Sequence, residues 1–221
     1  MTPRPVLGIV TIGQTPRPDL AATFAAAAPD ATVRVAGALD GLGAEEIAAL
    51  AVPGPYPLLV RLADGATAEV PRDTLVPRVA AAAAALAEGG ARLVVVACAG
   101  AFPAFPCAAP LLVPGRVVPA TVRAIAASGR IGIVTPNAAQ APFADAKWRA
   151  DGFDVVVTHA APSRADELAA AAARMRAAEI TLVVLDCMGH DEASRAAFAA
   201  ASGRPTVAVQ PLIASLAGAL V

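Results

Sequence analysis

Two cysteines are the residues of this 221-residue chain whose types and positions most favour chemistry. Cys98 and Cys187 each follow an apolar run and each precede a glycine, Gly100 or Gly189, by two positions. A thiolate on one side of a carbon atom and a thiol on the other can carry a proton from one face to the other. We therefore predict that Cys98 and Cys187 are a catalytic acid and base. The plainer interpretation is that each is a small buried apolar residue.

The surroundings of the two cysteines repeat along the chain. Residues 7–11 (LGIVT) recur as residues 131–135 (IGIVT), and residues 93–100 (LVVVACAG) recur as residues 182–189 (LVVLDCMG). Each half thus opens with a strand that ends in threonine and later has a strand that ends at cysteine. Ligands of open α/β sheets bind outside the carboxyl ends of the strands. We expect both threonines and both cysteines to line a cleft between the halves.

Polar residues beside these strand ends are the expected substrate-binding groups. Residues 13–17 (GQTPR) offer amides, a hydroxyl and a guanidinium at a predicted helix start, where a substrate carboxylate could bind. The alternative is that this segment and the one that contains Asn137 are ordinary turns, with Thr15 and Asn137 as helix caps. His190 could hold a proton near its thiol or cap the following helix, and Asp186 could orient a ligand or take a capping or turn role. The expected substrate-binding residues are Thr11, Gln14, Thr15, Arg17, Gly100, Thr135, Asn137, Asp186, Gly189 and His190.

The third cysteine and the aromatic residues are expected to pack in the protein core. Cys107 lies in a Pro-rich loop without a counterpart in the repeat, and Trp148, Phe143 and Phe153 have the surroundings of core residues. His159 ends a predicted strand, where it either lines the cleft or is exposed. Metal binding is not expected because no close Cys/His pairs are present, and no G-x-G-x-x-G follows the first strand. We expect no cofactor.

The elements that position these residues follow from the alternation of β-branched runs with alanine-rich stretches, which is typical of a mostly parallel α/β fold. The predicted strands are residues 5–11, 32–39, 92–97, 130–135, 154–159, 181–186 and 206–209, and the predicted helices are residues 18–28, 44–51, 72–88, 138–150, 163–178 and 192–201. Asp64-Gly65 joins two short β-type runs in a predicted hairpin that is inserted only in the first half. We expect two pseudo-symmetric Rossmann-like (flavodoxin-like) halves, residues 1–113 completed by 205–221, and residues 114–204.

Charge, hydrophobicity and cysteine pattern indicate which partners and which cellular compartment to expect. The net charge is -1 and the 17 basic residues are scattered, so nucleic acid is not expected. The hydrophobic fraction of 57% owes much to alanine, and the longest apolar run, residues 79–87, is shorter than the roughly 20 residues of a membrane-spanning helix. An N-terminus without a signal pattern and three cysteines without a C-x-x-C pair lead us to expect a cytoplasmic protein. The expected partner is a small carboxylate; a homodimer is compatible with the sequence.

Three segments resemble a known family. Residues 10–17 (VTIGQTPR), residues 184–190 (VLDCMGH) and the ending at residues 209–220 resemble the AroM family, with similarity along essentially the whole chain. That family is similar to the cofactor-independent aspartate/glutamate/hydantoin racemase superfamily, which includes maleate isomerase and arylmalonate decarboxylase. The resemblance implies two Rossmann-like halves that each contribute one cysteine, Cys98 and Cys187. Racemases usually have Asn-Thr/Ser-Ala after the first cysteine, where this chain has Ala99-Gly100-Ala101.

Three hypotheses of function follow. The first is a racemase or isomerase that acts on a small carboxylate-bearing carbon acid, such as an amino acid, a hydantoin or a dicarboxylate. The second is a non-catalytic protein that binds a carboxylate in the same cleft. The third is an isomerase or decarboxylase in which Cys187 alone acts covalently. Titration of the thiols separates a catalytic pair from packing cysteines, because only the former should include a thiolate near neutral pH.

Overall fold

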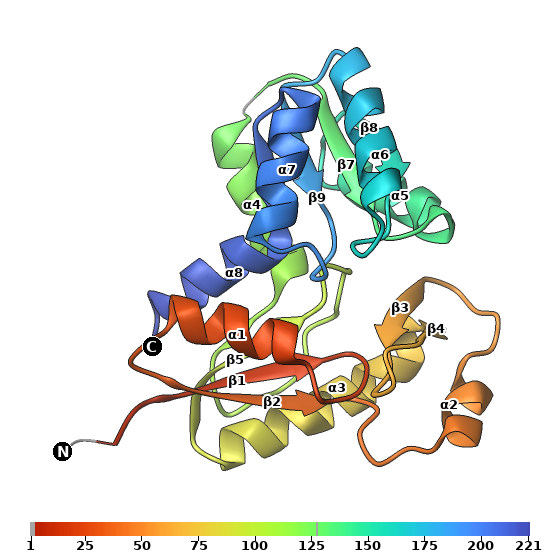
Figure 1. Ribbon diagram of the computed structural model, residues 1–221. Helices are drawn as coiled ribbons and strands as arrows, with labels where there is room; N and C mark the ends of the chain where they lie inside the picture. Colours follow the sequence, from red (N-terminus) through yellow and green to blue (C-terminus); the bar gives the residue numbers. More distant parts are fainter. Residues whose placement is uncertain (1–2, 127) are drawn as a thin grey trace. The chain divides into compact units, whose positions relative to one another are not determined.

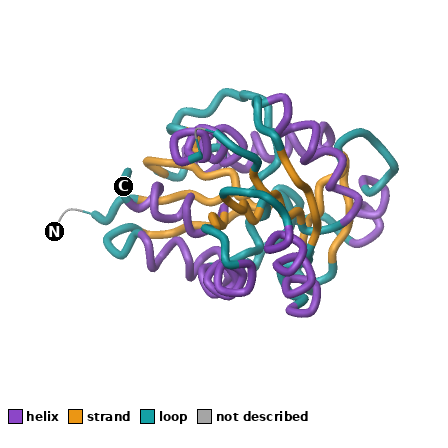
Figure 2. The backbone as a smooth tube through the Cα atoms, turned by 90° about the horizontal axis from the view of Figure 1, so that it is seen from above, coloured by secondary structure: helices purple, strands orange, loops and turns teal. Residues whose placement is uncertain are grey.

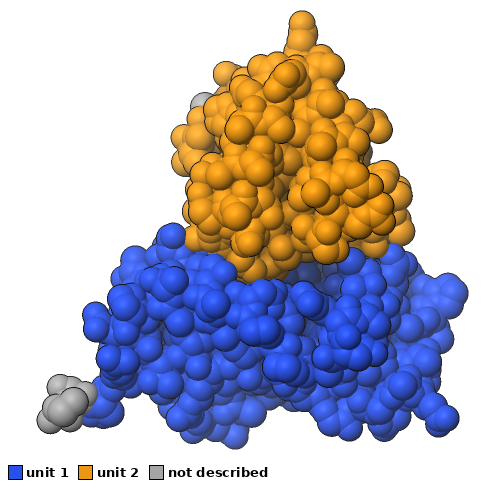
Figure 3. Space-filling view, in the orientation of Figure 1, with its two compact units in different colours: residues 1–114, 213–221 blue, residues 115–212 orange. Residues whose placement is uncertain are grey.

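The structure is a computed structural model that describes residues 3–126 and 128–221 (Figure 1). The chain forms two compact units, shown in separate colours in Figure 3: unit 1 is residues 1–114 with 213–221, and unit 2 is residues 115–212. Each unit contains a four-stranded sheet covered by helices, which alternate with the strands along the chain (Figure 2). Among the described residues, no helix has the length and apolar character required to cross a membrane.

In unit 1 the sheet has the strand order β2-β1-β5-β6 and every pairing in it is parallel. Its central strands are apolar on both faces, because α1 contacts the sheet on one side and α3 on the other (Figure 1). The elements are β1 (Val6–Thr11), α1 (Pro18–Ala27), β2 (Thr32–Gly37), α2 (Ala44–Leu50), β3 (Pro57–Arg61), β4 (Thr67–Pro71), α3 (Arg72–Glu88), β5 (Ala91–Ala97) and β6 (Leu111–Leu112).

In unit 2 the sheet has the order β10-β9-β7-β8, again with parallel pairings only. Helices α6 and α7 pack against each other, and α5 packs on β7 and β8. The elements are α4 (Pro114–Ile125), β7 (Ile131–Thr135), the 3-10 helix η1 (Ala138–Gln140), α5 (Ala141–Ala150), β8 (Val155–His159), α6 (Ala165–Ala177), β9 (Leu182–Leu185), α7 (Glu192–Ser202), β10 (Thr206–Ala208) and α8 (Val209–Gly218), whose last residues belong to unit 1.

The two sheets have the same topology. Read from its other edge, the second sheet has the order β8-β7-β9-β10, which corresponds strand for strand to β2-β1-β5-β6. The repeated sequence segments fall on equivalent strands, since residues 7–11 lie in β1 and residues 131–135 form β7. The prediction of an α/β fold with two pseudo-symmetric, mostly parallel halves is confirmed.

The predicted hairpin is also present, as β3 and β4 paired in antiparallel register. Its turn is closed by a hydrogen bond from the N–H of Leu62 to the oxygen of Ala66, with Gly65 at φ 87°. Glycine adopts this positive φ without the steric cost that a side chain would incur. The hairpin is inserted between α2 and α3, and its Leu58 and Val60 side chains are buried in the core of unit 1.

The structure differs from the sequence-based assignment at β10, α4 and α8. The prediction that residues 205–221 complete the first half is wrong for residues 205–212, because β10 pairs with β9 and the chain returns to unit 1 only at Ile213. Helices α4 and α8 were not predicted. Both contain proline, which favours loops in a sequence analysis: α4 begins at Pro114 and includes Pro119, whereas Pro211 lies in the first turn of α8, where a missing N–H costs little.

Candidate active site

The two cysteines lie in closely similar turns at the carboxyl ends of equivalent strands. Cys98 follows β5 and Cys187 follows β9 by two residues. The backbone N–H of Gly100 donates to the Sγ atom of Cys98 at 3.3 Å, and the N–H of Gly189 donates to the Sγ atom of Cys187 at 3.4 Å. A donor that points at sulfur favours the thiolate over the thiol. The local geometry of both turns therefore suits an acid or base.

A side chain at either glycine would make close contacts. A Cβ atom at Gly100 would lie 3.0 Å from the Leu58 Cδ2 atom and 3.3 Å from the Cys98 sulfur. A Cβ atom at Gly189 would lie 2.7 Å from the Cγ atom of Pro162. The spacing from cysteine to glycine that drew attention in the sequence thus has a steric reason in each unit.

Residues beside the hairpin hold the loop after Cys98. The N–H of Ala101 donates to the hydroxyl of Tyr56 at 3.4 Å, and the Nη1 atom of Arg72 donates to the Ala101 oxygen at 3.3 Å. The Arg72 guanidinium also lies over the Tyr56 ring, 4.9 Å from its centre. Tyr56 has φ 55°, which is rare for a residue with a side chain. Tyr56 and Arg72 are not among the residues expected from the sequence, because their roles depend on where the hairpin packs.

Donors in the residue 13–17 segment are used within unit 1. Arg17 donates from Nη1 to the hydroxyl of Thr11 at 3.0 Å and forms an ion pair with Asp19 at 2.6 Å. Burial acts to raise the pKa of Asp19, but the hydrogen bond and charge of Arg17 outweigh it, so this pKa lies below its ordinary value. Thr15 donates from N and Oγ1 to Asp40, at 2.7 and 3.0 Å, and does not cap α1, whose N-cap is Arg17. Carboxylate binding by Arg17 and Thr15 stays a prediction.

Gln14 connects the loop after β1 to two other segments. Its Nε2 atom donates to the oxygens of Leu39 and Leu42, at 3.2 and 3.0 Å, and its Oε1 atom accepts from the N–H of Ala63 at 3.1 Å. Its backbone N–H donates to the oxygen of Arg61 at 2.9 Å. The Gln14 side chain therefore has a structural role, and substrate binding by it stays a prediction.

In unit 2, Asp186 is fixed by donors from α5. Its Oδ2 atom accepts from Lys147 Nζ and from Trp148 Nε1, each at 2.8 Å. The Lys147 and Asp186 side chains are only 8% and 5% exposed. This contact replaces the expected capping or turn role of Asp186. Trp148 is fully buried, as predicted. Lys147 was not among the expected site residues, and the one feature of the sequence that sets it apart is that it is the sole lysine of the chain.

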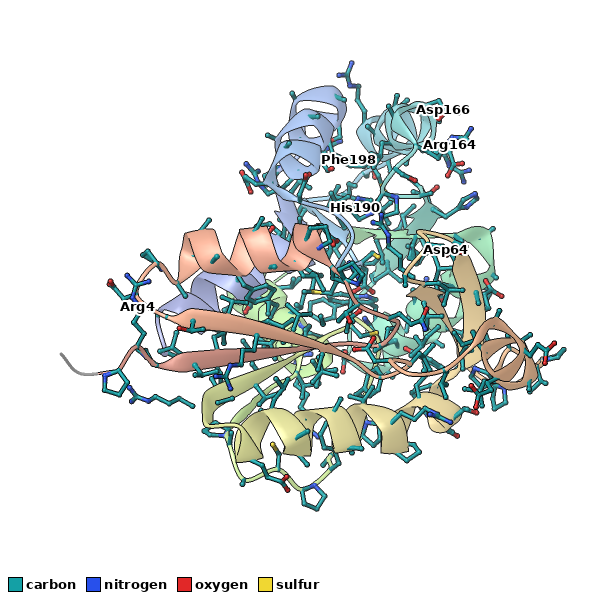
Figure 4. The ribbon with its side chains drawn as sticks, turned by 60° about the horizontal axis from the view of Figure 1, so that its bottom comes forward. Arg4, Asp64, Arg164, Asp166, His190 and Phe198 are labelled. Carbon is teal, nitrogen blue, oxygen red and sulfur yellow. The ribbon has the colours of Figure 1, made fainter. Side chains whose placement is uncertain are left out.

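His190 lies inside unit 2, close to the start of the helix that carries Phe198 (Figure 4). The side chain has no exposed surface, and within the part of the chain that the structure describes neither ring nitrogen has a hydrogen-bond partner. Burial, partly opposed by the charge of Asp191, lowers the pKa of His190 to about 4. The helix cap proposed for His190 is instead Asp191, which accepts from the N–H of Ser194 at 2.8 Å.

The depressed pKa of His190 predicts a pH-dependent stability. The unfolded chain takes up a proton near the ordinary value of 6.5, whereas the folded protein does so only near 4. Stability is therefore fully present above pH 6.5 and falls by about 3 kcal/mol as the pH decreases to 4. In urea unfolding, wild type should lose about 2 kcal/mol more than His190→Gln between about pH 7 and pH 4.5.

The matched control for this measurement is His159→Gln, because His159 is exposed. The lowered pKa values of Asp191 and Asp166 affect stability mainly below their ordinary value of 3.8, outside this window, and those of other carboxylates contribute equally in wild type and His190→Gln. An identical pH dependence in wild type and His190→Gln would contradict the prediction.

The remaining candidates of unit 2 lie at the same end of its sheet. Thr135, the last residue of β7, donates from Oγ1 to the oxygens of Asn137 and Thr158, at 2.8 and 3.3 Å. The Oδ1 atom of Asn137 accepts from the N–H of Gln140 at 3.0 Å, which is the capping role given above as its alternative. Gln210, from α8, donates to the Met188 oxygen at 2.8 Å and so holds the Cys187 turn.

Among residues 3–126 and 128–221, no group of three or more His, Cys, Asp or Glu side chains has an arrangement that could hold a metal ion. Cys107, for which we predicted packing, is half-buried against the core of unit 1, and its thiol donates to the Ala83 oxygen at 3.8 Å. The candidate chemistry of the described residues is therefore concentrated at the strand ends that carry Cys98 and Cys187.

Solved structures of known enzymes share this fold. A crystal structure of arylmalonate decarboxylase matches with a TM-score of 0.67 and 16% identity, over 98% of this chain and 92% of that chain. Maleate isomerase Iso from Pseudomonas putida S16 matches with a TM-score of 0.64 and 13% identity, over 96% and 90%. Glutamate racemase from Aquifex pyrophilus matches with a TM-score of 0.57 and 14% identity, over 98% and 84%. The chain thus has the fold of the racemase-like class.

The family is defined more closely by sequence. Residues 7–221 match the family model described as AroM protein, so the match includes both strand-end cysteines. The chain belongs to the AroM family. A search of curated proteins found no match.

Proposed function

We propose that this protein is a cofactor-independent racemase or isomerase that acts on a small carbon acid with a carboxylate group, such as an amino acid, a hydantoin or a dicarboxylate. The observation that carries the proposal is the duplicated turn in which a glycine N–H donates to the sulfur of Cys98 or Cys187. The two turns follow equivalent strands of equivalent sheets. The racemase-like fold supports the same class of reaction.

In the proposed reaction, the thiolate of one cysteine removes the proton from the carbon next to the carboxylate. The electron pair of the broken C–H bond moves into an enolate-like system, whose charge is met by backbone amides near the strand ends. The thiol of the other cysteine then gives its proton to the opposite face. One S–H bond has formed and one has broken, so the two cysteines exchange roles and no electrons are gained or lost.

One observation favours a second candidate, in which Cys187 acts alone. Cys98 is 7% exposed and belongs to the apolar core of unit 1, whereas Cys187 is half-buried between Asp186 and a turn that leads to His190. A single thiol can attack a substrate covalently or protonate a carbanion that remains after loss of carbon dioxide. This candidate corresponds to an isomerase or decarboxylase.

Deuterium exchange from solvent tests the proposal. The protein is incubated in D2O, without added cofactor, with amino acids, hydantoins and dicarboxylates, and the substrate carbons are followed by NMR. We expect deuterium to appear next to a carboxylate in at least one class, with inversion or isomerisation of the same compound. Protein whose thiols have been alkylated is the control. Binding without exchange across the panel would instead indicate a non-catalytic carboxylate-binding protein, and carbon dioxide release from substituted malonates would indicate the second candidate.

A further inference from the structure

Unsatisfied buried polar atoms belong to two residues close to Cys187 in the sequence. Within the described part of the chain, three buried side-chain atoms have no hydrogen-bond partner: Oδ1 of Asp186 and both ring nitrogens of His190. These two residues flank Cys187 in the sequence. Buried polar groups are normally paired, and an unpaired one calls for a specific explanation, such as a catalytic role. The polar surroundings of Cys187 therefore deserve an explanation beyond packing.

The Asp186 carboxylate is held from one side only. Lys147 and Trp148, neighbours on α5, both donate to Oδ2, at 2.8 Å each. Two donors on one oxygen fix the plane and direction of the carboxylate, and the other oxygen remains without a donor from the described residues. A buried ion pair of this kind is costly to form in desolvation and is weak evidence for stability alone. A role in the chemistry of Cys187, the residue next to Asp186, would account for the presence of this costly ion pair.

The charges of Lys147 and Asp186 can affect how readily the Cys187 thiol ionises. Asp186 precedes Cys187 directly, and an unbalanced carboxylate there would oppose ionisation of the thiol. The Lys147 ammonium balances it. The other titratable groups at this turn are His190, which burial keeps neutral near pH 7, and Asp191, which accepts hydrogen bonds from Ser194. On α5, the side chains of Asp145 and Arg149 are partly exposed and pair with each other. Lys147 and Asp186 are therefore the buried charged pair whose loss would change the charge near Cys187.

We infer that Lys147 is a positioning residue for Cys187, which orients the Asp186 carboxylate through Oδ2 and cancels its charge, so that the Cys187 thiolate can form. The inference rests on the proposed function in taking Cys187 as the reactive thiol. It assigns a role to the sole lysine of a chain whose other basic residues are all arginine. Arginine at this position would keep the charge, whereas a neutral side chain would not.

The test is the pH profile of iodoacetamide alkylation at Cys187, followed by peptide mass spectrometry on the full chain. Lys147→Met leaves the carboxylate unbalanced, so the midpoint should move to higher pH by on the order of one unit, with about tenfold slower alkylation near pH 7. Asp186→Asn removes the negative charge, so its midpoint should move to lower pH. The double variant Lys147→Met with Asp186→Asn should lie between them, near wild type.

Cys98 in the same samples is the internal control, since it belongs to unit 1 and its profile should not move. Lys147→Arg should restore the wild-type profile at Cys187. Shifts in the same direction for Lys147→Met and Asp186→Asn, equal changes at Cys98, or unchanged profiles in both single variants would each overturn the inference. The alkylation profile does not depend on turnover, so the two proposals can fail separately. Opposed shifts without deuterium exchange would support the role of Lys147 and contradict the proposed function. Deuterium exchange without opposed shifts would support the proposed function and contradict the role of Lys147.

Discussion

Cys98→Ser and Cys187→Ser should each lower the rate of inversion at the substrate carbon by about 10²- to 10⁴-fold, the usual contribution of a positioned acid or base. A serine hydroxyl has nearly the size of a thiol but ionises far less readily, so it neither removes the proton nor returns it. The same glycine N–H can still donate to the new oxygen. The loss should therefore reflect proton transfer instead of a collapsed turn.

Exchange separates the mechanisms in these variants. In a two-base reaction, the surviving cysteine can remove a proton and return deuterium on its own face, so one variant should still label one enantiomer of the substrate without inverting it. If Cys187 acts alone, Cys98→Ser should remain active and Cys187→Ser should be inactive. Chiral chromatography combined with NMR measures both quantities on one sample.

Cys107→Ser is the matched control for these two variants. The Cys107 thiol is half-buried and donates weakly to the Ala83 oxygen at 3.8 Å, outside both strand-end turns. We expect it to keep wild-type turnover. Full turnover in Cys98→Ser would contradict the assignment of Cys98 as a proton carrier and leave the single-cysteine candidate in place.

Gly13→Ala should destabilise the protein by about 4 kcal/mol or prevent folding. A Cβ atom at this position would lie 2.1 Å from the backbone oxygen of Arg61 and 2.9 Å from its nitrogen. That oxygen also accepts from the N–H of Gln14 at 2.9 Å, so relief of the clash requires movement of β3 and loss of this hydrogen bond. Backbone atoms of a paired strand cannot move away as the end of a flexible side chain can.

Urea unfolding followed by circular dichroism measures this effect. Gly43→Ala is the control, because the nearest atom to its added Cβ, an oxygen of Glu46, lies at 3.7 Å. Its cost should stay within about 1 kcal/mol, which is the usual range for a change at a helix N-cap. A Gly13→Ala protein whose stability is as close to wild type as that of Gly43→Ala would show that the contact between the loop after β1 and the hairpin is not required for the fold.

Local features of the sequence were sufficient to predict most elements. Strands β1, β5, β7 and β9 are buried on both faces, and such strands must be almost wholly apolar, so their positions are visible as short β-branched runs. Asp64-Gly65 marked the hairpin because its turn needs a positive φ. The repeat predicted equivalent strands for Cys98 and Cys187, since the order of elements follows the chain.

Tertiary structure alone decided which partners the polar side chains have. Lys147 and Asp186 are separated by 39 positions, and they meet because α5 packs on the sheet beside the end of β9. Gln14 bridges segments that are up to 49 positions away. The short β10 could pair with either sheet by its composition, and its partner was fixed by packing. Hydrogen bonds and ion pairs depend on distances between segments that no local pattern encodes, whereas periodicity and turn chemistry are properties of neighbouring residues.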